Sequence, residues 1–187
     1  MIKVNNDIGL RISQGDIYKN VEYIENFKEE GDEIKFSKII FPYVVILTQD
    51  CDLAQDCIFR NDDSKSDDKI ILSVLVAPLY NVDHFFQGAH LSELGKKMME
   101  VKQKKKGKLT TDAKNIFQNN NPRYHYLEFD ETVDIVPSII DFKQYFSLNT
   151  DYLYEIRSAN FVCNISSLYR EDISHRFASF LARIGLP

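Results

Sequence analysis

Three short apolar runs in the first 80 residues have the length and composition of buried β-strands. They cover residues 17–24, 39–47 and 70–79. Short runs of apolar and β-branched residues bounded by polar segments are typical of strands. The polar stretches between them predict a surface loop or ragged hairpin over 25–36 and a hairpin loop over 60–69. Residues 15–80 are therefore predicted to supply the core strands of a barrel-like sheet.

A different spacing follows in residues 83–118, which are predicted to form a helical insertion. Apolar residues recur there every three or four positions, at Leu91, Leu94, Met98 and Val101. This period is that of one face of an α-helix, and Gly107 is predicted to end the helix. A second short helix is predicted to start at Thr110 or Thr111 and to run through Phe117.

The last segment has the clearest helical pattern in the chain. Residues 123–165 first supply three further strand-like runs, and an apolar stripe begins after Ser166. The stripe consists of Tyr169, Ile173, Phe177, Phe180, Leu181 and Ile184. We predict a helix over 167–185, with Ser166 or Ser167 as its N-cap and Gly185 as a left-handed C-cap. Because the stripe is continuous, this helix should close the core.

Strands, a helical insertion, further strands and a closing helix together predict an α+β fold. The most economical arrangement is a small, strongly bent antiparallel barrel with inserted helices and a closing C-terminal helix. With 187 residues the chain has the size of one domain, so residues 1–187 are predicted to form a single unit.

The composition is that of a globular protein and indicates in which cellular compartment the protein resides. Hydrophobic residues make up 44% and charged residues 27%, which argues against disorder. The apolar runs are too short to cross a bilayer, and the N-terminus lacks the apolar region of a signal peptide. Three cysteines and four scattered histidines show no metal-ligand spacing. We therefore expect a cytoplasmic protein with no metal, no cofactor and no membrane partner; a homodimer is one assembly that the sequence allows.

Charge is distributed unevenly along the chain. The lysine segment, residues 96–108, holds seven lysines and one glutamate, a local charge of +6. The net charge is −5, so subtracting the local +6 leaves −11 on the remainder. Such a segment either keeps a helix end soluble or docks on RNA or on an acidic protein. The candidate binding residues are Lys102, Lys104, Lys105, Lys106 and Lys108.

The first 80 residues resemble the MazF/PemK family of toxin endoribonucleases. The matching pieces are Gly15-Asp16-Ile17-Tyr18, Pro42-Tyr43-Val44-Val45-Ile46-Leu47 and the run from 70 to 79. The resemblance covers less than half of the chain and implies an SH3-like barrel. It also implies RNA cleavage by an arginine in the loop before the second piece and a Thr or Ser after the third. This chain has Lys35 and Lys38 in that loop, and its third piece ends in Leu79-Tyr80.

The segment Thr48–Asp52 is a candidate site because a buried strand ends there in polar residues. One interpretation is a turn in which Cys51 packs as a small apolar side chain. The alternative is a catalytic thiolate at Cys51 with Asp52 beside it. Flanking carboxylates disfavour a thiolate, so the sequence favours packing, and catalysis would need a cation such as His125.

A second candidate lies on the strand predicted for residues 122–129. Arg123 and His125 project from one face and could serve as cation and general base in phosphodiester chemistry. Tyr124 and Tyr126 project from the other face and could stack on bases. The plainer interpretation is an amphipathic strand with a solvated polar face.

The sequence favours a binding or regulatory module on a MazF-like barrel, in a toxin or phage-defence setting. The first alternative is an RNA-cleaving endonuclease with a rearranged site at Arg123 and His125, and the second is a thiol-dependent enzyme using Cys51. The arginines of the closing helix are predicted to lie at the surface or in ion pairs, with Asp141 or Glu171 as partners.

Overall fold

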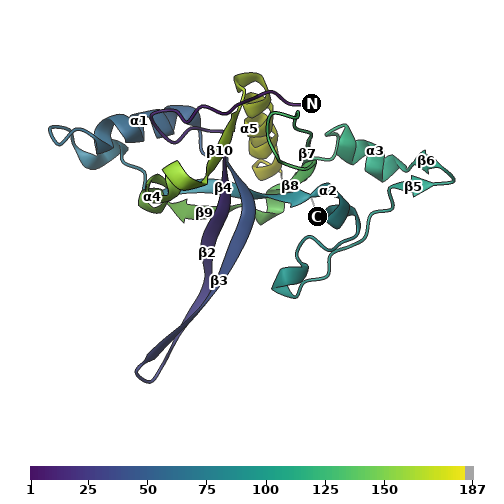
Figure 1. The fold of residues 1–187 in the computed structure, drawn as a ribbon, viewed down its shortest axis with the longest axis horizontal. Helices are drawn as coiled ribbons and strands as arrows, with labels where there is room; N and C mark the ends of the chain where they lie inside the picture. The colour runs from purple at the N-terminus through teal and green to yellow at the C-terminus, as the bar shows by residue number, and fades with distance from the viewer. Residues whose placement is uncertain (184–187) are drawn as a thin grey trace.

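The computed structural model describes residues 1–183 and has an α+β fold in which an antiparallel sheet curls into a half-barrel (Figure 1). Within those residues the sheet has eight strands, in the order β1-β10-β2-β3-β4-β8-β7, with β9 beside β4. The strands are β1 (Val4–Asn5), β2 (Asp16–Glu30), β3 (Glu33–Ile46), β4 (Ser73–Asn81), β7 (Tyr124–Leu127), β8 (Ser138–Asp141), β9 (Phe146–Asn149) and β10 (Phe161–Ile165).

Helices lie around this sheet and between its strands (Figure 1). The α-helices are α1 (Asp50–Arg60), α2 (Val82–Phe86), α3 (Thr111–Phe117), α4 (Thr150–Asn160) and α5 (Ser167–Leu181). Three short 3-10 helices are η1 (Asp67–Lys69), η2 (Ser92–Leu94) and η3 (Phe142–Gln144), and β5 (Lys104–Lys105) and β6 (Lys108–Leu109) form a separate hairpin. Within residues 1–183 no helix combines the length and apolar character needed to cross a bilayer.

The three apolar runs of the first 80 residues form neighbouring antiparallel strands, which confirms their prediction. Ile17 of β2 lies opposite Val45 of β3, and Val44 lies opposite Pro78 of β4. Strand β4 then continues the curl, because its first half pairs with β9 and its second half with β8. A parallel bridge between Ile2 and Phe129 connects the two ends of the sheet path.

Both faces of the sheet are covered, which explains why the strands appear in the sequence as continuous apolar runs. Ile17 and Tyr18 are adjacent and fully buried, and they belong to different core clusters. The first cluster includes Ile173, Phe177 and Phe180 of α5, and the second includes Leu53 of α1 and Leu153 of α4. Side chains that alternate along a strand point to opposite faces, so one strand contributes to two cores.

The closing helix forms as predicted from Ser167 and packs against the sheet, but its stripe is narrower than expected. Leu181 is 50% exposed because it lies one residue beyond Phe180, about 100° further around the helix. Ser166 occupies the N-cap position without a side-chain hydrogen bond. The predicted C-cap, Gly185, lies outside the described residues.

Two helices were not predicted. The sequence predicted a turn after residue 48, but α1 starts at Asp50, and α4 occupies part of 123–165, which was predicted as strands. Both helices carry an aspartate in the first turn, where it interacts favourably with the helix dipole. Asn149 caps α4 by accepting a hydrogen bond from the Tyr152 amide at 3.0 Å. These are recognisable helix starts, but each helix buries only one apolar side chain, Leu53 in α1 and Leu153 in α4.

The prediction of a helix from Leu91 to Val101 is wrong, whereas the prediction of a short helix after it is confirmed. Only the single 3-10 turn η2 forms, and Gly95 ends it with a φ of +66°. The chain then folds back, and the Val101 amide donates to the Phe86 carbonyl at 2.9 Å. Helix α3 forms with Thr110 as its N-cap, as predicted. The Thr110 hydroxyl accepts a hydrogen bond from the Ala113 backbone amide at 3.2 Å.

Candidate functional site

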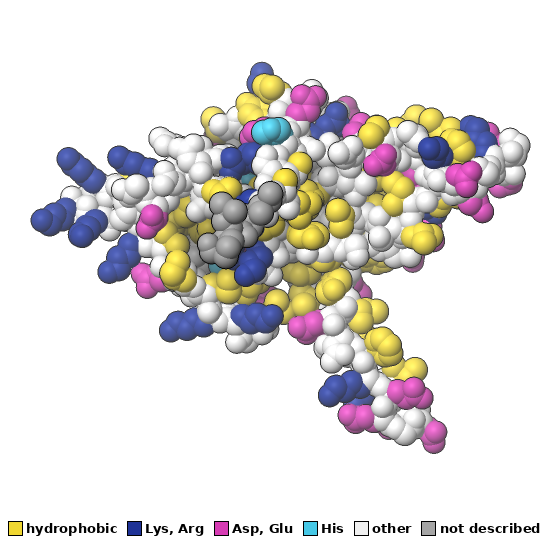
Figure 2. All heavy atoms as spheres, turned by 180° about the vertical axis from the view of Figure 1, so that it is seen from behind, with side chains coloured by type: hydrophobic (Ala, Val, Ile, Leu, Met, Phe, Trp, Pro, Cys, Tyr) yellow, Lys and Arg dark blue, Asp and Glu magenta, His cyan; other side chains and the backbone are white. Residues whose placement is uncertain are grey.

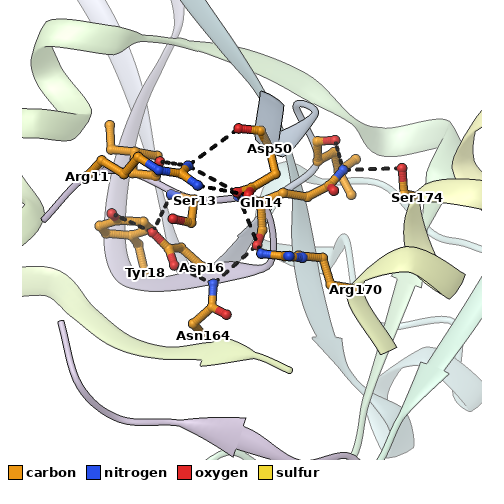
Figure 3. A network of polar contacts seen from close by, with 11 residues as sticks. Arg11, Ser13, Gln14, Asp16, Tyr18, Asp50, Asn164, Arg170 and Ser174 are labelled. Carbon is orange, nitrogen blue, oxygen red and sulfur yellow. Dashed lines mark hydrogen bonds and ion pairs between the residues drawn. The ribbon is translucent and has the colours of Figure 1, made fainter. Parts of the chain in front are cut away.

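A network of polar side chains connects the segment before β2 with the start of α1 and with α5 (Figure 3). We call it the Asp50 cluster, because the Asp50 carboxylate at the start of α1 receives contacts from the other two segments. Its members are Arg11, Gln14, Asp50, Arg170 and Ser174. Asp50 is the first residue of α1, so its negative charge also lies where the helix dipole favours it.

Arg11 holds Asp50 through two parallel hydrogen bonds, at 2.8 and 3.0 Å. The Gln14 backbone amide donates a hydrogen bond to the same carboxylate at 3.1 Å, and the Arg170 guanidinium forms an ion pair with it at 3.6 Å. Burial by itself would raise the pKa of Asp50. The hydrogen bonds from Arg11 and Gln14 and the two positive charges outweigh that effect, so the pKa is lowered. Asp50 is therefore ionised at neutral pH.

A second carboxylate, Asp16, lies beneath the Asp50 cluster and is 3% exposed. It accepts hydrogen bonds from the Ser13 amide at 2.8 Å and from the Asn164 side chain at 2.6 Å. Burial dominates these bonds and raises the pKa of Asp16 to about 6. Gly15, which precedes Asp16, has a φ of +81° and lies against the Arg170 side chain of the Asp50 cluster. A Cβ at this position would come within 3.3 Å of that side chain.

The raised pKa of Asp16 predicts a pH-dependent stability. A carboxyl whose folded-state pKa lies above its unfolded value stabilises the fold when protonated, and this contribution is lost as pH rises. For Asp16 the window runs from 3.8 to about 6. The stability of the wild type relative to Asp16→Asn should therefore fall by about 3 kcal/mol across it. Urea unfolding of both proteins at several pH values measures this; parallel pH curves would contradict it.

Cys51 and Asp52 lie on the first turn of α1 and are exposed. The prediction that Cys51 packs as an apolar side chain is wrong, because the segment is a helix start rather than a buried turn. The Cys51 thiol contacts Gln49 Oε1 and Asp52 Oδ1, both at 3.7 Å. Its hydrogen-bonding neighbours are therefore acceptors at the protein surface rather than apolar side chains of a core.

Arg123 immediately precedes β7 and His125 lies within it, but neither side chain is free to act on a substrate in this structure. Arg123 donates two hydrogen bonds to Asp141, at 2.7 and 2.5 Å. His125 is 3% exposed, and burial, together with the charge of Arg176, lowers its pKa to about 3. A neutral imidazole in the core cannot reach an RNA backbone without rearrangement.

The two tyrosines of β7 pack against aromatic side chains of α2 and α3. Tyr124 meets Phe85 edge-on with ring centroids 4.7 Å apart, and Tyr126 meets Phe117 at 5.0 Å. Both tyrosines are half-buried. The strand therefore buries both faces, in contrast to the solvated polar face that the plainer interpretation of its sequence predicted.

The lysine segment projects from the body of the protein. Instead of extending a helix, Lys104, Lys105 and Lys108 lie on the β5–β6 hairpin, and Gly107 occupies its turn with a φ of +77°. All seven lysines of the segment are exposed. Among residues 1–183 none of them forms an ion pair. Figure 2 shows positively charged side chains gathered at this end of the molecule.

A hollow of about 310 Å³ opens between the middle of β3, the end of β4 and the loop that contains η2. Its walls are mainly apolar and aromatic, and they include Ile40, Tyr43, Tyr80, His90 and Leu91. The sequence patterns gave no signal for this hollow, because its walls come from segments that are far apart in the chain.

The sequence patterns gave no signal for Arg11 and Gln14. An ion pair was predicted for the arginines of α5, but the predicted partners, Asp141 and Glu171, are wrong for Arg170. Asp141 pairs with Arg123, whereas Arg170 pairs with Asp50. Arg176 donates to the carbonyls of Asn121 and Tyr124, at 2.7 and 2.8 Å. Because Asp50 neutralises much of the positive charge around it, the Asp50 cluster anchors α1. The lysine segment, by contrast, concentrates seven exposed lysines that form no ion pair within residues 1–183.

Comparison with known proteins adds no assignment. No protein-family model matches the chain, and no curated protein matches it significantly.

Proposed function

We propose that this protein is a nucleic-acid-binding module that docks on RNA through the lysine segment. The observation that carries the proposal is the projection of seven exposed lysines, without ion pairs in the described chain, from a body of opposite charge. Lysines that are not neutralised by the protein can replace the counterions of a phosphate backbone, which supplies most non-specific affinity for nucleic acid.

The charge distribution restricts where a polyanion can bind. The lysine segment carries +6, and −5 minus this +6 leaves −11 on the rest of the chain. That remainder repels phosphates over most of the surface, so binding should be confined to the hairpin end of the molecule. The order of strands β2, β3 and β4 supports an SH3-like barrel of the MazF/PemK kind, and with it a regulatory role in a toxin or phage-defence setting.

Binding without cleavage fits the site geometry better than either enzymatic alternative. Arg123 is engaged with Asp141, and His125 is neutral and buried. The Cys51 thiol has a carboxylate and an amide oxygen as neighbours, rather than a cation that would stabilise a thiolate. The proposal therefore assigns recognition to the lysines and no chemistry to these residues.

Replacing Lys104, Lys105 and Lys106 with glutamine should weaken binding of single-stranded RNA. It should also reduce the slope of log K against log salt by about 0.7 for each phosphate that the variant no longer neutralises. Fluorescence anisotropy with a labelled oligonucleotide, measured over a range of salt concentrations, provides both quantities.

A matched control separates the hairpin from net charge. Replacement of Lys19, Lys28 and Lys69, which are exposed and lie outside the lysine segment, removes the same charge. This control should bind almost as the wild type does. If both triple variants bind RNA equally weakly, or if neither differs from the wild type, the lysine segment is not the docking surface.

A further inference from the structure

Strands β2 and β3 continue beyond the sheet as a two-stranded arm, residues 22–40 (Figure 1). The arm extends about 30 Å from its base, with Gly31 in its turn at a φ of +66°. Near the base the Tyr23 ring packs against Phe146 of β9, with ring centroids 4.7 Å apart, whereas residues 24–38 are exposed within residues 1–183. A two-stranded hairpin alone is marginally stable in water, so the exposed length of this arm calls for a partner surface.

One face of the arm carries an apolar stripe. Phe27 lies directly opposite Phe36, and Glu29 lies opposite Ile34. Lys38 and Ile40 alternate with Phe36 along β3 and therefore share its face nearer the base. Ile24 lies directly opposite Lys38, and an irregularity in the register between Ile24 and Asn26 keeps it on the same face as Phe27. The exposed fractions are Ile24 62%, Phe27 72%, Ile34 72%, Phe36 65% and Ile40 47%. Figure 2 shows hydrophobic side chains in a row along the arm.

The opposite face of the arm is polar. It carries Asn26 opposite Ser37 and Lys28 opposite Lys35, and all four are exposed. The arm is therefore amphipathic although neither face is covered over most of its length in residues 1–183. A long hydrophobic strand pair left open in this way is prone to self-association unless a specific partner covers it.

We propose that the apolar faces of two arms pack against each other in a two-fold symmetric homodimer. A two-fold interface joins the same patch on both copies, so each stripe finds an apolar surface of the same length. Five such side chains expose roughly 600 Å² for each arm, estimated from typical side-chain areas. Two arms together then bury roughly 1,200 Å², which is within the range of specific interfaces.

The charges of the arm favour an antiparallel crossing, with each tip beside the base of the other arm. Four of the five residues from 29 to 33 are acidic. At the base, Ile40 lines the hollow together with Leu91 and Leu94, and the chain continues from there to Lys96 and Lys97. An acidic tip would thus approach a lysine-bearing loop. In this arrangement Ile34 of one copy lies at the mouth of the partner's hollow.

Light scattering during size-exclusion chromatography tests the dimer. The wild type should elute as a dimer, and Phe27→Thr/Phe36→Thr should raise the dissociation constant by about 100-fold or more, because two central aromatic anchors are removed. Threonine retains β-propensity. The control is Lys28→Thr/Lys35→Thr, a directly opposed pair on the polar face, which should remain dimeric. A wild type that is monomeric at its highest soluble concentration, or a dimer that persists in the phenylalanine variant, would overturn the proposal.

A cross-link in the otherwise unchanged protein avoids any dependence on the fold of that variant. Lys38 lies close to the centre of the stripe, whereas Ser37 points to the polar face. Lys38→Cys should therefore form an intermolecular disulfide on mild oxidation, beyond any background from the native cysteines, and Ser37→Cys should not. Equal cross-linking of the two variants would show that the arms do not pack through this face. The dimer contact is made by the apolar stripe and uses none of Lys102, Lys104, Lys105, Lys106 or Lys108. Of the lysine segment it approaches only Lys96 and Lys97, so the dimer can form whether or not RNA binds the β5–β6 hairpin.

Discussion

Replacing Arg60 with alanine should lower the free energy of unfolding by about 3–5 kcal/mol. The side chain of Asp56 is completely buried, and Arg60 donates to it at 2.9 and 3.2 Å. Removing the guanidinium would leave a carboxylate in the core without its countercharge. Hydrogen bonds from the Ile71 amide at 2.8 Å and the Tyr154 hydroxyl at 3.3 Å would remain, but neither carries a positive charge.

This effect would also reach the Asp50 cluster, because both sites hold the same helix. Arg60 ends α1, and Asp50 begins it. Asp56 connects the helix to Ile71, just before β4, and to Tyr154 of α4. Loss of the Asp56–Arg60 pair should therefore loosen α1 as a whole and shift the position of Cys51 at its other end.

Urea unfolding of Arg60→Ala and of a matched control measures the loss. The control is Lys65→Ala, because the Lys65–Asp62 ion pair has side chains that are 36% and 40% exposed. Water screens an exposed pair, so this one should contribute little to stability. A loss for Arg60→Ala that is no larger than that of the control would mean that the backbone and tyrosine hydrogen bonds suffice to hold Asp56.

The strands of the half-barrel could be predicted because burial on both faces leaves a local signature. Val44, Val45 and Ile46 belong to two different cores, so no polar residue interrupts the run. The arm is the converse case. Between Ile24 and Phe36 only Phe27 and Ile34 are apolar, so this segment resembles a loop in the sequence, and both side chains stay 72% exposed within residues 1–183.

The helical errors have a physical cause in the connections between segments. Leu91 to Val101 has helical spacing, yet Gly95 ends the first turn and Met98 bonds back to the Gly88 carbonyl at 3.1 Å. Tertiary contact outweighs local propensity there. Helix α1 was missed because its buried face contains the charged residue Asp56. This carboxylate is satisfied by Arg60 and, from outside the helix, by the Ile71 amide and the Tyr154 hydroxyl.

The Asp50 cluster could not be assembled from sequence because its contacts span the chain. Arg11 and Asp50 are 39 residues apart, and Gln14 and Ser174 are 160 apart. Local patterns showed Asp50 as a polar residue after a strand, and Arg170 as a surface residue of a helix. The lysine segment was recognisable because its charge is local, although its hairpin conformation was not.

Replacing Phe177 with alanine should destabilise the fold by about 3–5 kcal/mol, the cost of deleting a buried aromatic ring. Phe177 is 6% exposed and lies against Phe142 and Tyr145, with ring centroids 5.5 and 5.2 Å apart. Phe142 is fully buried between the sheet and α5, so the neighbouring structure has little freedom to collapse into the space. Removing the ring should therefore leave a cavity rather than a repacked core.

Leu181 provides the matched control, since it lies on the same helix and in the same sequence stripe but is 50% exposed. Leu181→Ala should cost well under half as much in urea unfolding, because less apolar surface is removed from the interior. Similar losses for the two variants would indicate that helix propensity, rather than burial against the sheet, sets the contribution of α5. A loss below about 1 kcal/mol for Phe177→Ala would show that α5 is peripheral to the fold, because core phenylalanine truncations cost several times more.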